Sequence, residues 1–295
     1  MKKFFYVYSQ LGLMENIPID SVNIIKDYLF FKPKTKKELK EAIDSWCENK
    51  QEALTKYNNI SLWDTSLITD MSYLFSDKKN FNDNINNWDV SNVTSMYSMF
   101  SYAIKFNQPL DLWNVSKVNN MASMFSNAHS FNQLLNKWDV STVVTIGSMF
   151  WAAKSFNQPL DEWDVSSVKN IPYMFKGASS FNQPLDSWDV SSVYNMDAMF
   201  QEATSFNQPL NSWDTSSVSV MSCMFQEALS FNQPLNSWDT SNVTLMNYMF
   251  RRASSFNQNL NSWNVSKIKT YNFVDDIFKG ASLFDKKNAL WYDFD

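Results

Sequence analysis

Recurring carboxylates are the residues of this 295-residue sequence whose types and spacing could do chemistry. An aspartate directly follows a tryptophan in seven places, and further acids stand one or two residues before a tryptophan. Rows of acids could bind cations or a basic protein surface. The predicted acidic interaction surface comprises Asp89, Asp111, Asp139, Asp161, Glu162, Asp164, Asp186, Asp189, Asp214 and Asp239.

Two other interpretations of these acids need to be weighed. A glycosidase site needs one asymmetric pair of carboxylates with separated pKa values, whereas these acids recur in every copy of a repeat. A local role is the interpretation that we favour for the aspartates after tryptophan. Seven ionised side chains in neighbouring turns would repel one another by about 1 kcal/mol per pair in water. Backbone hydrogen bonds to each aspartate would stabilise its ionised form.

The other reactive residue types are scarce. There is one histidine, His129, and the two cysteines, Cys47 and Cys223, form no CxxC pair. A zinc site needs several such ligands close together, and a phosphate-binding loop needs closely spaced glycines, whereas the four glycines here are scattered. We therefore expect no enzymatic activity, no metal and no cofactor, with His129 facing solvent and both thiols buried.

Charge and hydropathy narrow the possible partners and locations. The formal charge of −5 gives no electrostatic basis for binding nucleic acid. No stretch of about twenty apolar residues occurs, so we expect no membrane span. Residues 1–8 superficially resemble a secretory signal, but Gln10 interrupts the apolar run, and Met14 is an alternative start. We expect a monomeric cytoplasmic protein, with the cell or virion surface as the alternative.

A 25-residue repeat organises the chain. Nine of the 12 tryptophans are spaced by 25, from Trp63 to Trp263, and two phenylalanine columns with the same spacing begin at Phe75 and Phe81. After Trp263 the register shifts by three, so that residues 278 and 284 continue both phenylalanine columns. One tryptophan and two phenylalanines per unit predict a single elongated aromatic core.

Within each unit the spacing of apolar residues changes. Leu185, Trp188 and Val190 follow an LxxLxL pattern that is typical of an extended segment. The stripe from Val193 to Ala203 has the i, i+3, i+7 spacing of a short helix. We therefore predict an α/β solenoid of the leucine-rich-repeat type, with eight or nine turns that each contain one short parallel strand and one short helix. The alternative is a β-helix in which the second segment is extended.

Polar columns mark the ends of these elements. A serine stands just before each helical stripe, as Ser191 does, and we predict that it is the helix N-cap. The Asn-Gln-Pro sequence of five units predicts a turn that restarts the strand. An asparagine at one place in eight units, from Asn82 to Asn257, predicts a ladder whose side chains bind the backbone of neighbouring turns.

The unit that begins at Phe181 reads Phe-Asn-Gln-Pro-Leu-Asp-Ser-Trp-Asp-Val-Ser, and Met-x-x-Met-Phe-x-x-Ala follows it. This unit resembles the repeat of the BspA-like leucine-rich-repeat surface-protein family, over about residues 60–285. The resemblance implies a non-enzymatic repeat scaffold. Members are found in bacterial surface proteins and are expanded in protists and large DNA viruses, with protein binding or adhesion as the implied role.

The ends of the chain differ from the repeat. We predict a helical N-terminal region and cap in residues 1–59 and a solenoid in residues 60–295, with a C-terminal cap from about residue 267. Thr35-Lys-Lys-Glu38 is a capping box for the cap helix. Residues 14–32 are similar to the start of an F-box, which implies a Skp1-like partner, although a plain cap helix is the alternative. The sequence therefore leaves three alternative functions: a protein-interaction scaffold, an F-box adaptor of a ubiquitin ligase and a surface adhesin.

Overall fold

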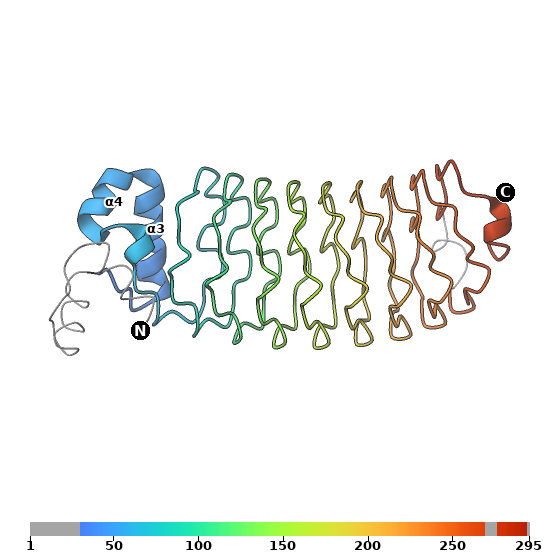
Figure 1. The fold of residues 1–295 in the computed structure, drawn as a ribbon, viewed down its shortest axis with the longest axis horizontal. Helices are drawn as coiled ribbons and strands as arrows, with labels where there is room; N and C mark the ends of the chain where they lie inside the picture. Colours follow the sequence, from blue (N-terminus) through green and yellow to red (C-terminus); the bar gives the residue numbers. More distant parts are fainter. Residues whose placement is uncertain (1–29, 269–275, 294–295) are drawn as a thin grey trace.

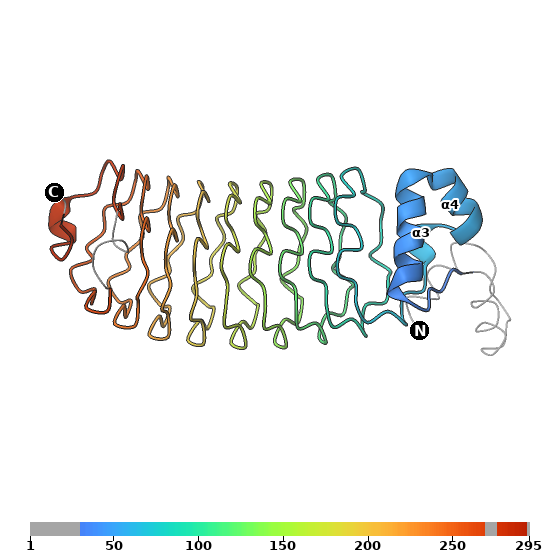
Figure 2. The same cartoon turned by 180° about the vertical axis from the view of Figure 1, so that it is seen from behind.

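The computed structural model describes residues 30–268 and 276–293 and has the shape of a rod (Figure 1). Two helices, α3 (Lys36–Glu48) and α4 (Lys50–Tyr57), stand at one end, and a 3-10 helix, η1 (Ile60–Leu62), leads into the first turn. The repeat units follow as turns stacked along the long axis, as the reverse view also shows (Figure 2). A second 3-10 helix, η2 (Lys286–Asn288), lies at the far end.

The helical cap forms where the sequence predicts it. The side chain of Thr35 accepts the N–H of Glu38 at 3.2 Å, and the Glu38 carboxylate accepts the N–H of Lys34 at 2.6 Å. These bonds supply partners at the start of α3, where backbone N–H groups lack intrahelical acceptors. The ring of Trp46 packs nearly perpendicular to that of Trp63 on the first turn, with centroids 6.0 Å apart. The buried face of α3 consists of Leu39, Ala42, Ile43 and Trp46.

The stacked turns contain neither the predicted helix nor the predicted strand. From residue 64 to residue 268 the described chain consists of tight turns, irregular segments and isolated bridge residues. Each turn meets the next in a single parallel β-bridge, and the bridges form one column of equivalent positions from Asp70 to Leu245. The prediction of an α/β solenoid with one strand and one helix per turn is therefore wrong, and the structure is a stack of non-helical turns.

Hydrogen bonding in the segment that was predicted to be helical explains the difference. The N–H groups of Met71, Tyr73 and Phe75 donate to carbonyls of the next turn at 2.8–3.0 Å, not to carbonyls four residues earlier. Tyr73 and Asp77 have positive φ values of 64° and 62°, as at the third position of a type II turn. Successive tight turns direct apolar side chains inward at intervals of three and four residues, so they reproduce the spacing of a helix.

The β-helix alternative is nearer to this arrangement in one respect. Neighbouring turns pair through their backbones in parallel, as they do in a β-helix. The segment itself is nevertheless a chain of tight turns and is not extended.

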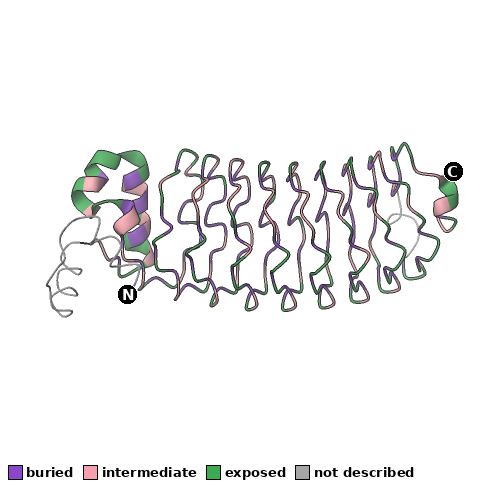
Figure 3. Ribbon diagram, viewed as in Figure 1, coloured by how far each residue is buried: buried purple, intermediate pink, exposed green. Residues whose placement is uncertain are grey.

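Three columns of aromatic rings form the core. Stacked tryptophan rings of neighbouring turns have centroids 6.1–6.4 Å apart, and the two phenylalanines of each turn stack at 3.9–4.2 Å. Each column tryptophan from Trp88 to Trp263 donates its indole N–H to a backbone carbonyl 28 residues earlier, at 2.8–3.2 Å. Buried residues recur in every turn along the rod, so the core is continuous (Figure 3).

The aromatic columns continue across the shift in register. Phe278, Phe284 and Trp291 stack on Phe250, Phe256 and Trp263, with centroids 5.7–6.2 Å apart. The two phenylalanines confirm the predicted continuation. Trp291 extends the tryptophan column as well, which was not predicted.

Candidate interaction surfaces

The ten predicted acids, which we call the acidic ridge, form two rows beside the tryptophan column. In the row directly after tryptophan, Oδ1 of each aspartate accepts the N–H of the serine two residues later, at 2.8–3.2 Å. Asn114 and Asn264 make the same bond without a charge. The local role predicted for these aspartates is confirmed. The prediction that the serines cap helices is wrong, because each serine is the donor in a tight turn.

These local bonds also favour the ionised form of two aspartates in the row. The hydroxyl and N–H groups of the serine two residues later lower the pKa values of Asp164 and Asp189, since they bind the ionised form. The charge of Asp189 acts in the opposite direction on the pKa of Asp164, so neighbours along the row interact. At neutral pH Asp164 and Asp189 therefore present ionised carboxylates to solvent.

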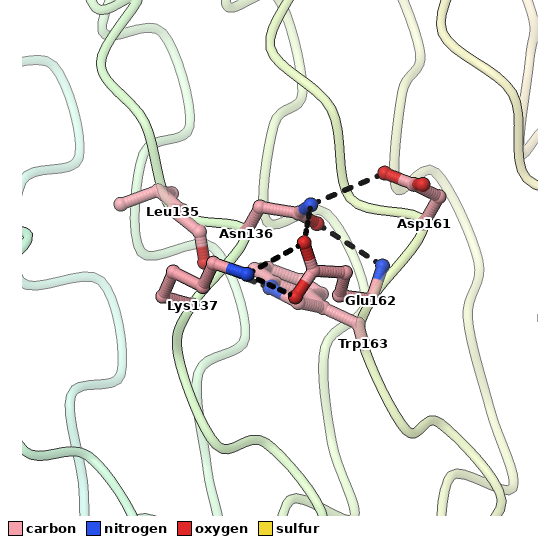
Figure 4. A network of polar contacts seen from close by, with 6 residues as sticks. All are labelled: Leu135, Asn136, Lys137, Asp161, Glu162 and Trp163. Atoms are coloured by element: carbon pink, nitrogen blue, oxygen red, sulfur yellow. Dashed lines mark hydrogen bonds and ion pairs between the residues drawn. The ribbon is translucent and has the colours of Figure 1, made fainter.

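The second row of the ridge is connected from turn to turn by amides. Nδ2 of Asn136 donates to Asp161 Oδ1 at 3.2 Å and to Glu162 Oε1 at 3.0 Å, while its Oδ1 accepts the N–H of Glu162 at 3.1 Å (Figure 4). Lys137 forms an exposed ion pair with Glu162 at 2.6 Å. Asn86 donates in the same way to Asp111 at 2.8 Å. Part of the acidity of this row is thus already engaged by the preceding turn.

The asparagine ladder is confirmed. Oδ1 of Asn157 accepts the N–H of Asn182 and the side-chain amide of Gln183 from the next turn, at 2.9 and 3.0 Å. The same backbone bond joins every neighbouring pair of the column, at 2.8–2.9 Å, and the column consists of Asn82, Asn107, Asn132, Asn157, Asn182, Asn207, Asn232 and Asn257. The same asparagine recurs in these turns because its side chain accepts a backbone N–H of the next turn.

The scarce reactive residues do not come together. No group of three or more His, Cys, Asp or Glu side chains within residues 30–268 and 276–293 could hold a metal ion. Cys47 is exposed and Cys223 is half-buried, so the prediction of two buried thiols is wrong. His129 is partly exposed, and its pKa is lowered by partial burial and by the charge of Lys154. In the part of the chain that is described, no helix has the length and apolarity needed to cross a bilayer.

Residues 14–29 of the F-box-like segment lie outside the described residues. The Skp1-like partner that this segment implies stays a prediction.

A surface that the sequence reasoning missed lies on the segment of tight turns. The exposed aromatic side chains of the described residues are Tyr73, Tyr102, Trp151, Tyr173 and Tyr194. All five stand six to fourteen residues after a column tryptophan, a stretch that we call the aromatic arc. The available signal was the variation among copies: at these positions the units differ, whereas the core and ladder positions repeat.

Comparisons with known proteins follow the repeat. The family model described as "Mycoplasma protein of unknown function, DUF285" matches residues 37–161, 133–228 and 208–293. No match was found among curated proteins. One similar solved chain comes from "Crystal structure of TLR13-ssRNA13 complex", with 8% identity and a TM-score of 0.22. The match covers 86% of this chain and only 52%, about half, of that chain, and at this TM-score it carries no argument about fold or ligand.

Proposed function

This chain belongs to the family described as Mycoplasma protein of unknown function, DUF285, and we propose that it is a non-enzymatic scaffold for protein partners. The observation that carries the proposal is the regularity of the rod. Stacked tryptophan rings 6.1–6.4 Å apart keep equivalent positions of successive turns in rows. Repeat proteins bind partners through extended surfaces of this kind, because each turn adds a few contacts to a continuous face.

The acidic ridge is the surface that a basic partner would fit in this proposal. Two successive turns contribute five of its carboxylates, those of residues 161, 162, 164, 186 and 189. Of these five, Glu162 is the one that pairs with a lysine in the described residues. Long-range attraction by such a field speeds association and weakens with added salt. A cytoplasmic location and a monomeric state belong to the same proposal.

The test begins with capture on the immobilised full chain, followed by binding of each captured protein, purified, in calorimetry. We expect saturable binding of a defined partner that weakens as salt is raised from 50 to 300 mM. A variant in which Asp161, Asp164, Asp186 and Asp189 are all replaced by asparagine should bind at least tenfold more weakly. The fold should persist, since Asn114 and Asn264 already make the turn bond of Asp164 and Asp189, and asparagine already stands at the position of Asp161 and Asp186 in other turns.

Two results would count against the proposal. Failure of every purified candidate to bind saturably would remove the scaffold function. Binding that is unchanged in the fourfold asparagine variant would keep the scaffold and remove the acidic ridge from it.

A further inference from the structure

The aromatic arc is chemically distinct from the rest of the surface. The exposed aromatic side chains of the described chain all lie on it, although it is about a third of each turn. Tyrosine, tryptophan and arginine supply large contact areas at protein interfaces, and serine and asparagine supply adaptable hydrogen bonds. The residues ten and thirteen positions after each column tryptophan are exposed or half-buried residues of these types in several turns, among them Tyr73, Ser76, Ser123, Trp151, Tyr173, Tyr248 and Arg251.

Side chains are kept on the arc at a conformational cost. Two positions per turn have a left-handed backbone, with φ between 51° and 76° from Tyr73 to Gly280. Glycine adopts this conformation without strain, yet it occupies only two of these positions, at Gly177 and Gly280. Tyr173 has a φ of 58° and points an exposed ring outward. Tyr173 therefore combines a strained backbone with an exposed ring.

Two successive turns concentrate these features. The rings of Trp151 and Tyr173 have centroids 6.4 Å apart, and Nζ of Lys176 lies 5.7 Å from each centroid. Trp151 is 40% exposed and Tyr173 is 36% exposed. A hydrogen bond to Asp197 is the main cause that raises the pKa of Tyr173 to about 12. We call Trp151, Tyr173 and Lys176 the aromatic patch.

The backbone beside the aromatic patch lacks a hydrogen bond that three other turns make. In the bridge column, Oδ1 of Asn195 accepts the N–H two residues later at 2.9 Å, and Asp70 and Asn120 do the same. In the turn of the patch that position is Pro172, which has no N–H, so Oδ1 of Asn170 is buried without a partner. Gly147 makes room for this proline, because a Cβ there would lie 3.1 Å from Pro172 Cδ.

The two segments that form the patch carry positive charge, and the acid next to them is Asp197 of the following turn, which bonds to Tyr173. Residues 144–154 and 169–179 contain three lysines and no acidic residue, in a chain whose formal charge is −5. The lysines are Lys154, Lys169 and Lys176, and none of them forms an ion pair with any residue of the described ranges. An ammonium group between two exposed rings suits a ligand that brings a carboxylate next to a flat apolar group.

We propose that the aromatic patch binds a protein segment that presents an Asp or Glu beside an aromatic residue or proline. The carboxylate pairs with Lys176, and the apolar side chain packs against Trp151 and Tyr173. This inference rests on the proposed scaffold function and assigns it a second surface, separate from the acidic ridge.

The probe is a phage-displayed library of linear dodecapeptides, selected on the immobilised full chain. We expect enrichment of peptides with an acidic residue within two positions of an aromatic residue or proline. A fluorescent synthetic peptide of the enriched sequence then measures affinity by anisotropy. Trp151→Ala should weaken binding about tenfold or more, and Lys176→Gln at least fivefold, whereas Lys176→Arg should stay within twofold.

The repeat supplies a matched control. Gln226 occupies the same position of its turn as Trp151 and Lys176 do in theirs, so Gln226→Ala should leave the peptide affinity unchanged. Urea denaturation of each variant establishes that the loss of binding is not a loss of fold, which is expected because Trp151 is already 40% exposed.

Four outcomes would overturn the assignment. The first is that the selection enriches basic peptides or no peptides, and the second is that Trp151→Ala still binds the peptide. The third is that a dT20 oligonucleotide, bound through Lys176, displaces the peptide. The fourth is that the protein forms a dimer which Trp151→Ala dissociates. If a partner is captured equally by the wild type, by Trp151→Ala and by Lys176→Gln, the scaffold function stands and only the patch assignment fails.

Discussion

Asn157→Ala removes one rung of the asparagine ladder and leaves the core untouched. Oδ1 of Asn157 accepts two donors from the next turn, the backbone N–H of Asn182 at 2.9 Å and the amide of Gln183 at 3.0 Å. The half-buried N–H loses its acceptor, which costs about 1.5 kcal/mol. The Gln183 amide can turn to water and loses about 0.5 kcal/mol. We therefore expect a loss of about 2 kcal/mol, while the N–H of residue 157 keeps its bond to Asn132.

Hydrogen exchange measured by mass spectrometry is the suitable assay, because long repeat arrays do not unfold in two states. A local loss of about 2 kcal/mol speeds exchange about thirtyfold, and a peptide that covers residues 181–184 should show this. Peptides three or more turns away should exchange at the wild-type rate, since each turn contacts only its neighbours.

Asn157→Asp is the matched variant. It keeps an acceptor oxygen in the same place, so its exchange should stay within threefold of wild type. The chain itself has an aspartate, Asp285, at the end of this column, where its N–H donates to Oδ1 of Asn257 at 2.9 Å. Exchange in Asn157→Ala that is less than threefold faster than wild type would refute the ladder argument, as would an aspartate variant as unstable as the alanine variant.

Three further predictions follow from the other hydrogen bonds. Asp164→Ala should speed hydrogen exchange of a peptide that covers residues 164–167 about fivefold at pH 7, by removing a bond of about 1 kcal/mol, whereas Asp164→Asn should stay within about twofold of wild type. Because the folded-state pKa of Asp164 is lowered, the effect of the alanine variant should be present above about pH 4 and vanish as pH falls through the folded-state pKa. Asn195→Ala should speed local hydrogen exchange about fivefold, because it removes a bond of about 1 kcal/mol. Asn170→Ala should have little effect, because Oδ1 of Asn170 has no partner. Equal effects of the two variants would contradict the account of the turn that contains Pro172. Trp188→Phe keeps a ring in the column but loses the indole bond to the Leu160 carbonyl at 2.9 Å, so local hydrogen exchange should speed about thirtyfold, for a loss of about 2 kcal/mol, and an increase below about twofold would contradict the argument.

The core could be predicted from the sequence because repetition exposes it. Buried rings that stack from turn to turn require the same side chain in every unit, so the columns at Trp88, Phe75 and Phe81 could be recognised as a core. The asparagine ladder was legible for the same reason. Trp291 follows Trp263 at the same interval as Phe278 follows Phe250, so the shift already seen at Phe278 would have located it.

The local conformation could not be predicted, because two backbones share one apolar spacing. Inward side chains at intervals of three and four residues arise from a helix and from successive tight turns alike. Glycine normally marks left-handed turn positions, but here Tyr73, Ser98 and Cys223 occupy them, so the usual signal is missing. The local role of the acidic row was predicted correctly. The aromatic arc was not predicted, because its residues vary from unit to unit and the repeat pattern marks only the constant positions.

The β-bridges and the ladder bonds always join residues one repeat unit apart. This regularity affects how the number of repeats in the gene can change. Each turn presents complementary backbone groups on its two sides, so turns can change neighbours without losing these bonds, apart from the turn of Pro172, which needs the space left by Gly147. Unequal crossing-over between two copies of the repeat removes or adds one whole unit and brings matching sides together. The product is a rod that is shorter or longer by one turn and keeps its core in register. Length is thereby a trait that can be inherited in discrete steps, each taken in a single genetic event.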